Sequence, residues 1–269
     1  AAVHSMENKP DIIDINMGCP APKISSNGSG SALMKNPLLC GEIVKAVTNA
    51  VDVPVTVKIR KGWNNSAVNA VEVVDAVDIP VTVKIRKGFN DELINAPEMA
   101  QVAQENGAAA IAVHGRTREQ YYKPPVDYDI IKEVNNAVSI SVIANGDITS
   151  AKIAKEVMDY TGCQLVMVGR ASLGNPWIFS EINAYLENPD CIIKAPTLEE
   201  KLNVMCRHIE KMVEYKGEHM AMLQARKLIA GYFKGMRGAA ELRNQSGKVC
   251  TLNDLYALKN KALSSVYDA

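Results

Sequence analysis

A cysteine that could take part in chemistry lies near the start of the chain. The β-rich run at residues 12–15 leads into Asn16-Met17-Gly18-Cys19-Pro20. Glycine and proline end strands, so we expect Cys19 on a loop at the carboxyl end of a strand. In parallel α/β folds that end is where ligands bind. A thiol there could act as a nucleophile or as a proton donor. The structural alternative is a small buried cysteine that caps the strand.

Basic and imidazole side chains mark further strand ends. Lys58 and Lys84 interrupt two strands that are otherwise apolar. A lysine is costly to bury unpaired, so each should face a polar ligand or a carboxylate, unless it reaches past the sheet edge into water. His114 and Arg116 follow another strand. His114 could orient a ring or hydrogen-bond to a cofactor carbonyl, and a structural histidine is the alternative.

Two later strand ends carry glycine beside polar residues. Asn145-Gly146-Asp147 follows one apolar run and Gly169-Arg170 follows the next. Glycine lets backbone N–H groups approach a phosphate closely, and the N-terminus of the following helix adds its dipole. Barrels build such a site after their last two strands. The pair therefore predicts a phosphate-binding site.

Six short β-branched runs alternate with helical segments over residues 11–180. This alternation predicts a parallel sheet with crossover helices, buried on both faces as in a barrel or a doubly wound sheet. After a helix at 177–187, residues 197–264 predict helices only, beginning at a cap on Thr197. We therefore predict an α/β domain over residues 1–190 and a small all-helical domain over 191–269. The predicted strands are 11–16, 53–60, 79–86, 109–114, 140–145 and 164–169.

One strand-loop-helix unit occurs twice in tandem. Residues 50–63 and 76–89 are identical at 12 of 14 positions, at an offset of 26 residues. Two copies do not make a solenoid. We expect both copies within one sheet, joined by a short helix at about residues 66–77.

Charge is unevenly distributed, although the formal net charge is zero. Residues 194–269 contain 13 Lys and Arg against 8 Asp and Glu, whereas residues 1–193 contain 17 against 22. The excess lies within 219–248 and predicts either a surface for a polyanion or an ordinary solvated helix face. The basic residues of this segment are Arg226, Lys227, Lys234, Arg237, Arg243 and Lys248.

The six cysteines are scattered and form no C-x-x-C pair. This pattern argues for reduced thiols in a cytoplasmic protein, and against a disulfide framework or a metal site. No apolar run approaches the ~18 residues needed to span a membrane, and no signal peptide is expected.

Together these strand ends resemble those of the tRNA-dihydrouridine synthases, in particular the bacterial B-type branch. The matching strings run in family order from about residue 9 to 244, and as a set they are highly specific. They are DIIDINMGCPAPKI, VPVTVKIRKG, AIAVHGRTREQ, ANGDI, VGRASLGNPWIF, ARKLIAGYFKG and GAAELRN. The resemblance implies a TIM-type barrel that binds FMN, followed by a helical tRNA-binding domain.

The resemblance also implies a reaction and its residues. FMN, reduced by NADPH, would pass a hydride from N5 to C6 of a uracil flipped out of the tRNA. Cys19 would protonate C5 from the opposite face, while Asn16 and, more weakly, Arg116 would contact the substrate. The basic tail would hold tRNA through Arg226, Lys227 and Arg243. The implied cofactor contacts are Lys84 or Lys58 and His114 at the flavin ring, and Asn145, Gly146, Asp147, Gly169 and Arg170 at the phosphate.

The chain also departs from the family pattern. Family members begin with three more strands, one with an Ala-Pro-Met loop and one with a flavin-contacting glutamine, and neither string occurs here. We therefore expect an incomplete barrel of about six strands, with self-association through its open edge as one consequence. Of the two repeated lysines we favour Lys84 for the flavin, because its strand directly precedes the crossover to His114. Arg237 stands where the family usually has proline.

The sequence leaves two alternatives open. One is a non-catalytic tRNA-binding remnant, for which the missing flavin contacts and the duplicated strand argue. The other is a different FMN-dependent pyrimidine oxidoreductase of the same barrel, against which the basic helical tail argues.

Overall fold

A computed structural model defines the fold. The structure describes residues 10–19, 21–59, 62–64, 67–77, 80–236 and 238–267, so that Arg237 lies outside the described residues. The chain forms two compact units, which we describe separately. The first comprises residues 1–146 and 157–167, and the second comprises residues 147–156 and 168–269. The functional division at residue 190 stays a prediction.

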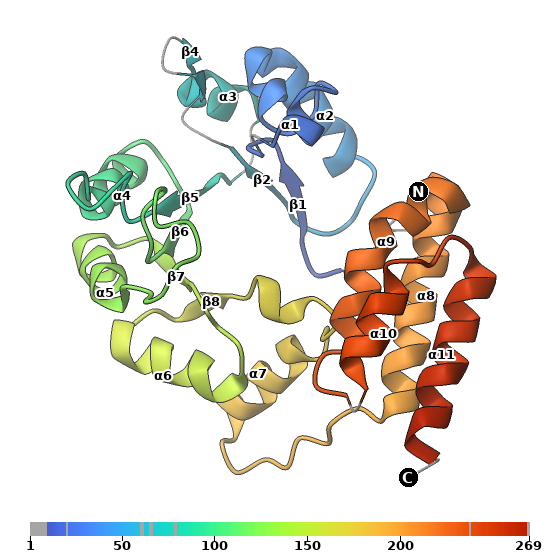
Figure 1. Cartoon of the computed structure of the whole chain (residues 1–269). Helices are drawn as coiled ribbons and strands as arrows, with labels where there is room; N and C mark the ends of the chain where they lie inside the picture. Colours follow the sequence, from blue (N-terminus) through green and yellow to red (C-terminus); the bar gives the residue numbers. More distant parts are fainter. Residues whose placement is uncertain are drawn as a thin grey trace. The chain divides into compact units, whose positions relative to one another are not determined.

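The first unit is built on a parallel sheet of six strands in the order β1-β2-β5-β6-β7-β8 (Figure 1). All six predicted strands are present. Among the described residues β1 and β8 each pair on one side only, which confirms an incomplete barrel of TIM type. The strands are β1 (Ile13–Asn16), β2 (Val55–Lys58), β5 (Thr82–Arg86), β6 (Ala110–His114), β7 (Ser141–Asn145) and β8 (Leu165–Met167).

The strand register gathers polar residues on one face of this sheet. His114 pairs with Asn145 across β6 and β7. Side chains alternate along a strand, so residues two apart share a face. Lys58 pairs with Thr82, which puts Lys84 on the same side as Lys58. This side, which we call the polar face, carries Asn16, Lys58, Lys84, Arg86, His114 and Asn145.

The opposite face of the sheet is apolar and faces helices. Its strand residues Val57, Ile111 and Val113 are fully buried. Two of the covering helices begin at side-chain caps, because Asn36 accepts a hydrogen bond from the backbone of Leu39 and Asp127 accepts one from that of Ile130. Figure 1 shows the helices along the outer side of the strands. They are α2 (Pro37–Thr48), α3 (Ala70–Val77), α4 (Ala96–Glu105) and α5 (Tyr128–Ala137).

The loop after β1 adds two short elements, and one helix is shared. The short elements are α1 (Pro22–Ser25) and the 3₁₀ helix η2 (Gly30–Lys35). Helix α6 (Ala151–Thr161) is divided between the two units.

The two copies of the repeat lie side by side in the sheet. β2 comes from the first copy and β5 from the second. Each copy pairs over its length on its outer side, β2 with β1 and β5 with β6. Between them the described residues form a single ladder pair, Lys58 with Thr82. The repeat also contains a small antiparallel hairpin that the sequence analysis did not predict, β3 (Gly62–Asn64) with β4 (Ala67–Val68).

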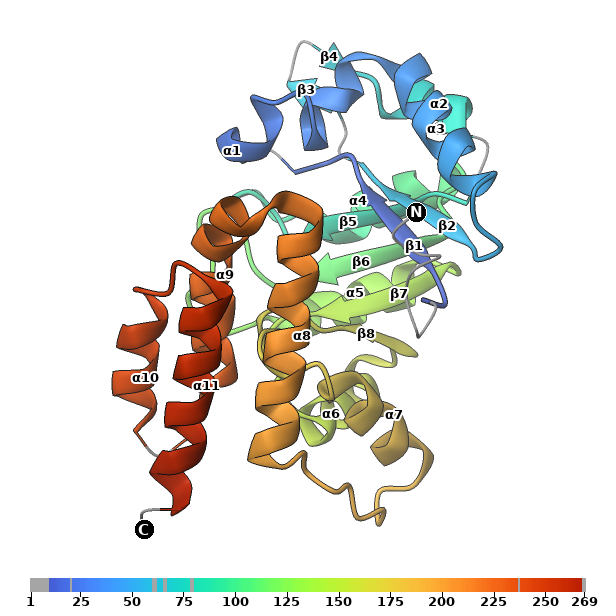
Figure 2. The ribbon, with the colours of Figure 1, turned by 90° about the vertical axis from the view of Figure 1, so that its right-hand side faces the viewer.

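The second unit consists of helices joined by loops, and it includes the short 3₁₀ helix η3 (Arg170–Ser172). Thr197 and Glu200 form the predicted capping box, in which each side chain accepts the other residue's backbone N–H. Figure 2 shows the four C-terminal helices packed alongside one another, around a core that includes Leu202, Ile229 and Phe233. The helices are α7 (Ile178–Glu187), α8 (Leu198–Lys216), α9 (Glu218–Tyr232), α10 (Ala239–Ser246) and α11 (Leu252–Tyr267). Across the described part of the chain, none of the helices is both long and apolar enough to span a bilayer.

Candidate active site

Cys19 lies on a loop that is held by a backbone hydrogen bond to the 3₁₀ helix η2. Its carbonyl oxygen accepts a hydrogen bond of 2.9 Å from the backbone N–H of Ser31. Gly30 passes so close that a Cβ there would lie 2.7 Å from the same oxygen, which explains the glycine. The cysteine is half-buried rather than enclosed. The predicted position at the carboxyl end of β1 is therefore observed, and its catalytic role stays a prediction.

Asn16, at the end of β1, has its amide oxygen fixed. That oxygen accepts a hydrogen bond of 3.1 Å from the backbone N–H of Gly18 and one of 3.4 Å from Nζ of Lys58. Both neighbours are donors, so the amide group is oriented with its oxygen toward them. The NH₂ group of Asn16 is therefore directed away from Gly18 and Lys58. Asn16 precedes Cys19 by three residues in the chain.

Lys84 is the most perturbed basic group on the polar face. Its Nζ donates a hydrogen bond of 2.9 Å to the amide oxygen of Asn145, and the NH₂ group of Asn145 donates to the carbonyl of Met167 at 2.9 Å. Burial, followed by the positive charges of Arg86 and Lys58, lowers the pKa of Lys84 to about 8. No carboxylate pairs with Lys84 in the contacts of the described residues. A polar ligand with oxygen or nitrogen acceptors would satisfy this ammonium.

His114 and Arg116 are buried beside one another at the end of β6. His114 is 6% exposed and Arg116 is 1% exposed. A guanidinium nitrogen of Arg116 lies 3.5 Å from Nε2 of His114, and Nε of Arg116 donates to the carbonyl of Lys123 at 2.8 Å. Arg116 therefore braces the loop that follows β6. Its predicted contact with substrate stays a prediction.

The backbone at Gly146 is shaped by close packing. Gly146 has a φ of 137°, and a Cβ there would lie 2.8 Å from the Val126 side chain and 3.3 Å from the His114 ring. The hydroxyl of Tyr128 donates to the Gly146 carbonyl at 2.8 Å. A side chain at position 146 would be strained and would clash, so the glycine is required here.

Two residues of the predicted phosphate site meet within the second unit. Nη2 of Arg170 donates to Oδ1 of Asp147 at 2.8 Å, and both side chains are largely accessible to solvent. Asp147 adopts a left-handed φ of 46°, directly after Gly146 in the chain. A Cβ on the exposed Gly169 would meet no atom within 4 Å. The loop at Gly169 is thus open to a bound group.

The predicted tRNA contacts in the tail differ in their surroundings. Arg226 donates from Nε to the carbonyl of Val249 at 3.1 Å and from Nη2 to Sγ of Cys250 at 3.3 Å, so it ties α9 to the segment before α11. Lys227 and Arg243 are exposed on α9 and α10. The two exposed residues suit RNA better than Arg226 does.

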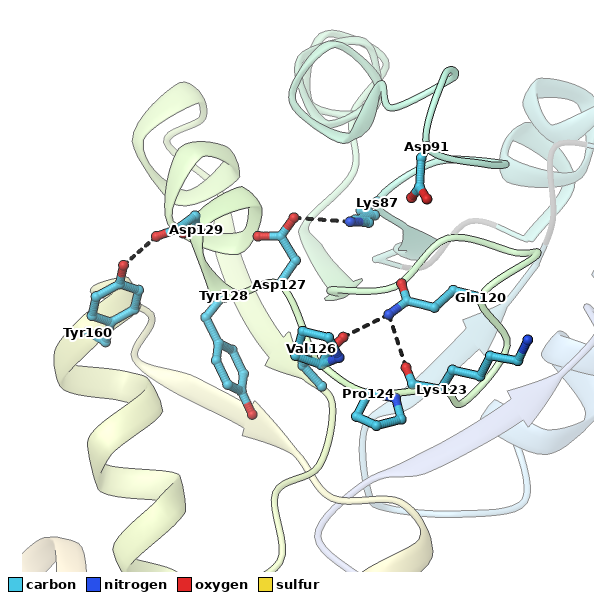
Figure 3. A pocket seen from close by; sticks show the side chains of 11 residues that line it. Lys87, Asp91, Gln120, Lys123, Pro124, Val126, Asp127, Tyr128, Asp129 and Tyr160 are labelled. Carbon is cyan, nitrogen blue, oxygen red and sulfur yellow. Dashed lines mark hydrogen bonds and ion pairs between the residues drawn. The ribbon is translucent and has the colours of Figure 1, made fainter.

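A hollow of about 760 Å³ lies beside the loops that follow β5 and β6 (Figure 3). Lys87 and Asp127 form an ion pair of 3.1 Å in its wall, and Tyr160 donates to Asp129. None of the residues predicted for the site lines this hollow. Lys87 was missed by the sequence analysis, although it lies in the repeated Lys-Ile-Arg-Lys string directly after β5. Its ion pair with Asp127 joins residues 40 positions apart, for which the sequence carries no signal.

The fold and the polar face define an enzyme of the (β/α)-barrel class, with its polar residues at the carboxyl ends of parallel strands. A sequence model of the family described as dihydrouridine synthase matches residues 1–77 and 69–266, in two segments that overlap within the repeat. The chain belongs to this family of oxidoreductases.

Individual relatives agree with the family match. The chain is 41% identical over 268 residues to tRNA-dihydrouridine synthase B of Vibrio parahaemolyticus, covering 100% of this chain and 74% of that protein. It is 40% identical over 250 residues to the probable tRNA-dihydrouridine synthase of Rickettsia conorii, covering 93% of this chain and 66% of that protein. The similar solved structures are more distant. One is a mandelate oxidase variant with an FMN adduct, which is 14% identical in sequence with a TM-score of 0.43. The match covers 91% of this chain and 77% of that one.

Proposed function

We propose that this chain reduces uridines in tRNA to 5,6-dihydrouridine, with FMN as cofactor and NADPH as reductant. The observation that carries the proposal is the polar face, where Lys84, His114 and Asn145 gather beside each other at strand ends, on the sheet whose β1 leads into the Cys19 loop. Relatives of about 40% identity over nearly the whole chain are named tRNA-dihydrouridine synthases, which supports the same substrate here.

The residues of the polar face suit a flavin. Flavin rings present carbonyl oxygens and ring nitrogens, and Lys84 offers an ammonium whose observed protein partner is an amide oxygen. Gly146 lets the backbone after Asn145 pack closely against the Val126 and His114 side chains. Lys84, with Lys58 as the less favoured copy, and His114 would hold the ring. Asn145, Gly146, Asp147, Gly169 and Arg170 would hold the phosphate, Arg170 as the cation and Asp147 as its partner.

The proton step belongs to the chain's own residues. Bound FMN, once reduced by NADPH, would supply the hydride for C6 of the uracil. The Cys19 thiol would give its proton to C5, which leaves a thiolate. Because Cys19 is half-exposed, water can return the proton. Asn16, with its oxygen engaged by Gly18 and Lys58, would present its NH₂ group to a uracil carbonyl. Hydride and proton together account for the two hydrogens that the product gains.

The target base must leave its stack before its ring carbons can be reached. The second unit offers exposed Lys227 and Arg243 for the tRNA backbone. We therefore assign the barrel domain, residues 1–190, to FMN and the helical domain, residues 191–269, to tRNA. A tRNA substrate and scattered cysteines favour the cytoplasm as the place of reaction.

The function is tested with the purified chain. We expect visible flavin absorption bands near one FMN per chain, and dihydrouridine in tRNA from a synthase-lacking cell when NADPH is supplied. A colourless protein that takes up no FMN but binds tRNA would contradict the proposal in favour of a binding remnant. Reduction of free pyrimidines without any effect on tRNA would point to another oxidoreductase of this barrel.

Charge reversal in the tail should weaken tRNA binding. With Lys227→Glu and Arg243→Glu combined, we expect a rise in Kd of about tenfold at 0.1 M salt and a shallower dependence of log Kd on log salt, because two phosphate contacts are lost. The matched control reverses two other exposed lysines, Lys45 of α2 and Lys152 of α6. Binding is measured by fluorescence anisotropy of labelled tRNA. Equal losses in both double variants would rule out a specific docking surface on α9 and α10.

A further inference from the structure

Exposed aromatic and arginine side chains gather on the two loops that follow β5 and β6. Phe89 is 49% exposed and Tyr121 is 66% exposed, although both are large and apolar enough to favour burial. The guanidinium of Arg118 lies over the Phe89 ring, 5.4 Å from its centroid. We call Phe89, Arg118 and Tyr121 the loop platform. Its flat faces point to a partner that stacks.

The loop platform is held in place before any partner binds. The backbone N–H of Arg118 donates to the carbonyl of Gly88 at 3.0 Å, and that of Glu119 donates to the carbonyl of Phe89 at 3.0 Å, so the two loops are joined. Beneath them Arg86 donates to the carbonyl of Tyr121 at 3.0 Å. Preorganisation of this kind lowers the entropic cost of binding.

Backbone strain marks the same place. Tyr121 has a φ of 57°, and among the described residues only Asp147 shares a positive φ without being glycine. A bulky residue is unfavourable in this region of backbone conformation, and such strain concentrates at functional positions. Here the strained backbone belongs to the most exposed aromatic ring of the two loops.

The loop platform adjoins the polar face. The ring of Tyr121 packs edge-on against that of Tyr122 at a centroid distance of 4.5 Å, and Tyr122 lies 6.3 Å from the ring of His114. A nucleotide on the loop platform would therefore lie close to a flavin ring held at His114, and so close to the uracil that this flavin reduces. Both sites belong to the first unit.

We propose that the loop platform stacks an unpaired nucleobase of the tRNA that flanks the uridine to be reduced, an inference that rests on the proposed function. Aromatic rings and arginine planes are the groups that hold single-stranded bases. The charged residues of the two loops balance, with Lys87, Arg116, Arg118 and Lys123 against Asp91, Glu92, Glu119 and Asp127. Stacking rather than phosphate neutralisation must then supply the affinity. This separates the loop platform from the basic tail.

The experiment compares Phe89→Ala combined with Tyr121→Ala against the wild type. We expect the Kd for tRNA to rise about tenfold, with an unchanged slope of log Kd against log salt, and the KM for tRNA to rise in parallel. FMN absorption and the rate of flavin reduction by NADPH should stay at wild-type values. Phe89→Trp should bind tRNA as the wild type does, because it keeps the aromatic face.

Leu93→Ala is the matched control, since Leu93 is 61% exposed on the same loop but is not aromatic. Wild-type affinity in the Phe89/Tyr121 double variant, or an equal loss in Leu93→Ala, would overturn the proposal, and the exposed rings would then indicate a protein partner. Because tRNA affinity is measured without turnover, a wild type that binds tRNA but forms no dihydrouridine would reject the proposed function alone. A wild type that binds no tRNA would reject both.

Discussion

Replacing Cys19 with alanine should lower the rate of dihydrouridine formation by a factor of about 10² to 10⁴, the range typical of a lost general acid. The thiol is proposed to give a proton to C5 of the uracil, and alanine has none to give. Pre-reduced enzyme mixed with tRNA provides the measurement, because flavin reoxidation reports a single turnover. Reduction of the flavin by NADPH should proceed at the wild-type rate, since it does not involve C5.

Two further variants make this expectation specific. Cys19→Ser keeps a proton on a much less acidic group, so its rate should lie between those of the wild type and Cys19→Ala. Cys191→Ala removes a cysteine of similar partial exposure from the second unit and should leave the rate unchanged. A single-turnover rate in Cys19→Ala within threefold of the wild type would exclude Cys19 as the acid.

Lys84→Met should lower dihydrouridine formation at least tenfold and at the same time stabilise the fold. Burial and two nearby cations lower the pKa of Lys84 from 10.5 to about 8, a cost of roughly 3 kcal/mol for the charged form. Methionine removes this cost but leaves the amide oxygen of Asn145 without its donor. We therefore expect a net rise of about 1–2 kcal/mol in the free energy of unfolding at pH 7, measured by urea denaturation. Lys84→Met should thus be more stable and less active than the wild type.

The pH dependence of this stabilisation follows from the direction of the shift. Lys84 in the folded chain loses its proton near pH 8, whereas in the unfolded chain it keeps the proton until about pH 10.5. The unfolded state thus binds more protons across this window, so the contribution of Lys84 to stability rises with pH between these values and is least favourable below pH 8. The advantage of Lys84→Met should accordingly shrink from pH 7 to pH 10.

Lys58→Met is the matched control, because Lys58 is the equivalent residue of the first copy. Its Nζ donates to the amide oxygen of Asn16 at 3.4 Å, whereas the amide oxygen of Asn145 accepts from Lys84. We expect a loss of activity below threefold and no gain in stability. If Lys58→Met lost more activity than Lys84→Met, the first copy would supply the flavin contact.

Local patterns predicted most of the fold. All six strands and the capped start of α8 were found because β-branched runs and the Thr-x-x-Glu box are short-range signals. The β3–β4 hairpin was missed, since it falls inside the repeat where a helix was expected to begin. The candidate residues were predicted from strand ends, but their partners were not. Lys84 and Asn145 are 61 residues apart, and only the register of β5, β6 and β7 brings them together.

Burial was the other property that the sequence did not reveal. Arg116 lies in a polar string, which gave no sign that its side chain is buried and bonded to its own loop. Arg226 counts toward the basic segment, yet its guanidinium serves the packing of α9 against the chain before α11. Counting charges along a chain does not distinguish a guanidinium that faces solvent from one that satisfies a backbone carbonyl.

The paired repeat gives this sheet a redundancy that a single-copy barrel lacks. β2 pairs with β1 and β5 pairs with β6, so each copy keeps a neighbour on its outer side. The junction that the duplication created lies between the two copies, which we call sister strands. Among the described residues they share one ladder pair. Each sister carries a lysine on the polar face. Selection can therefore keep one lysine for its role while the other is free to change. A new side chain at position 58 would lie on the same face of the sheet, level with Thr82 and two residues before Lys84.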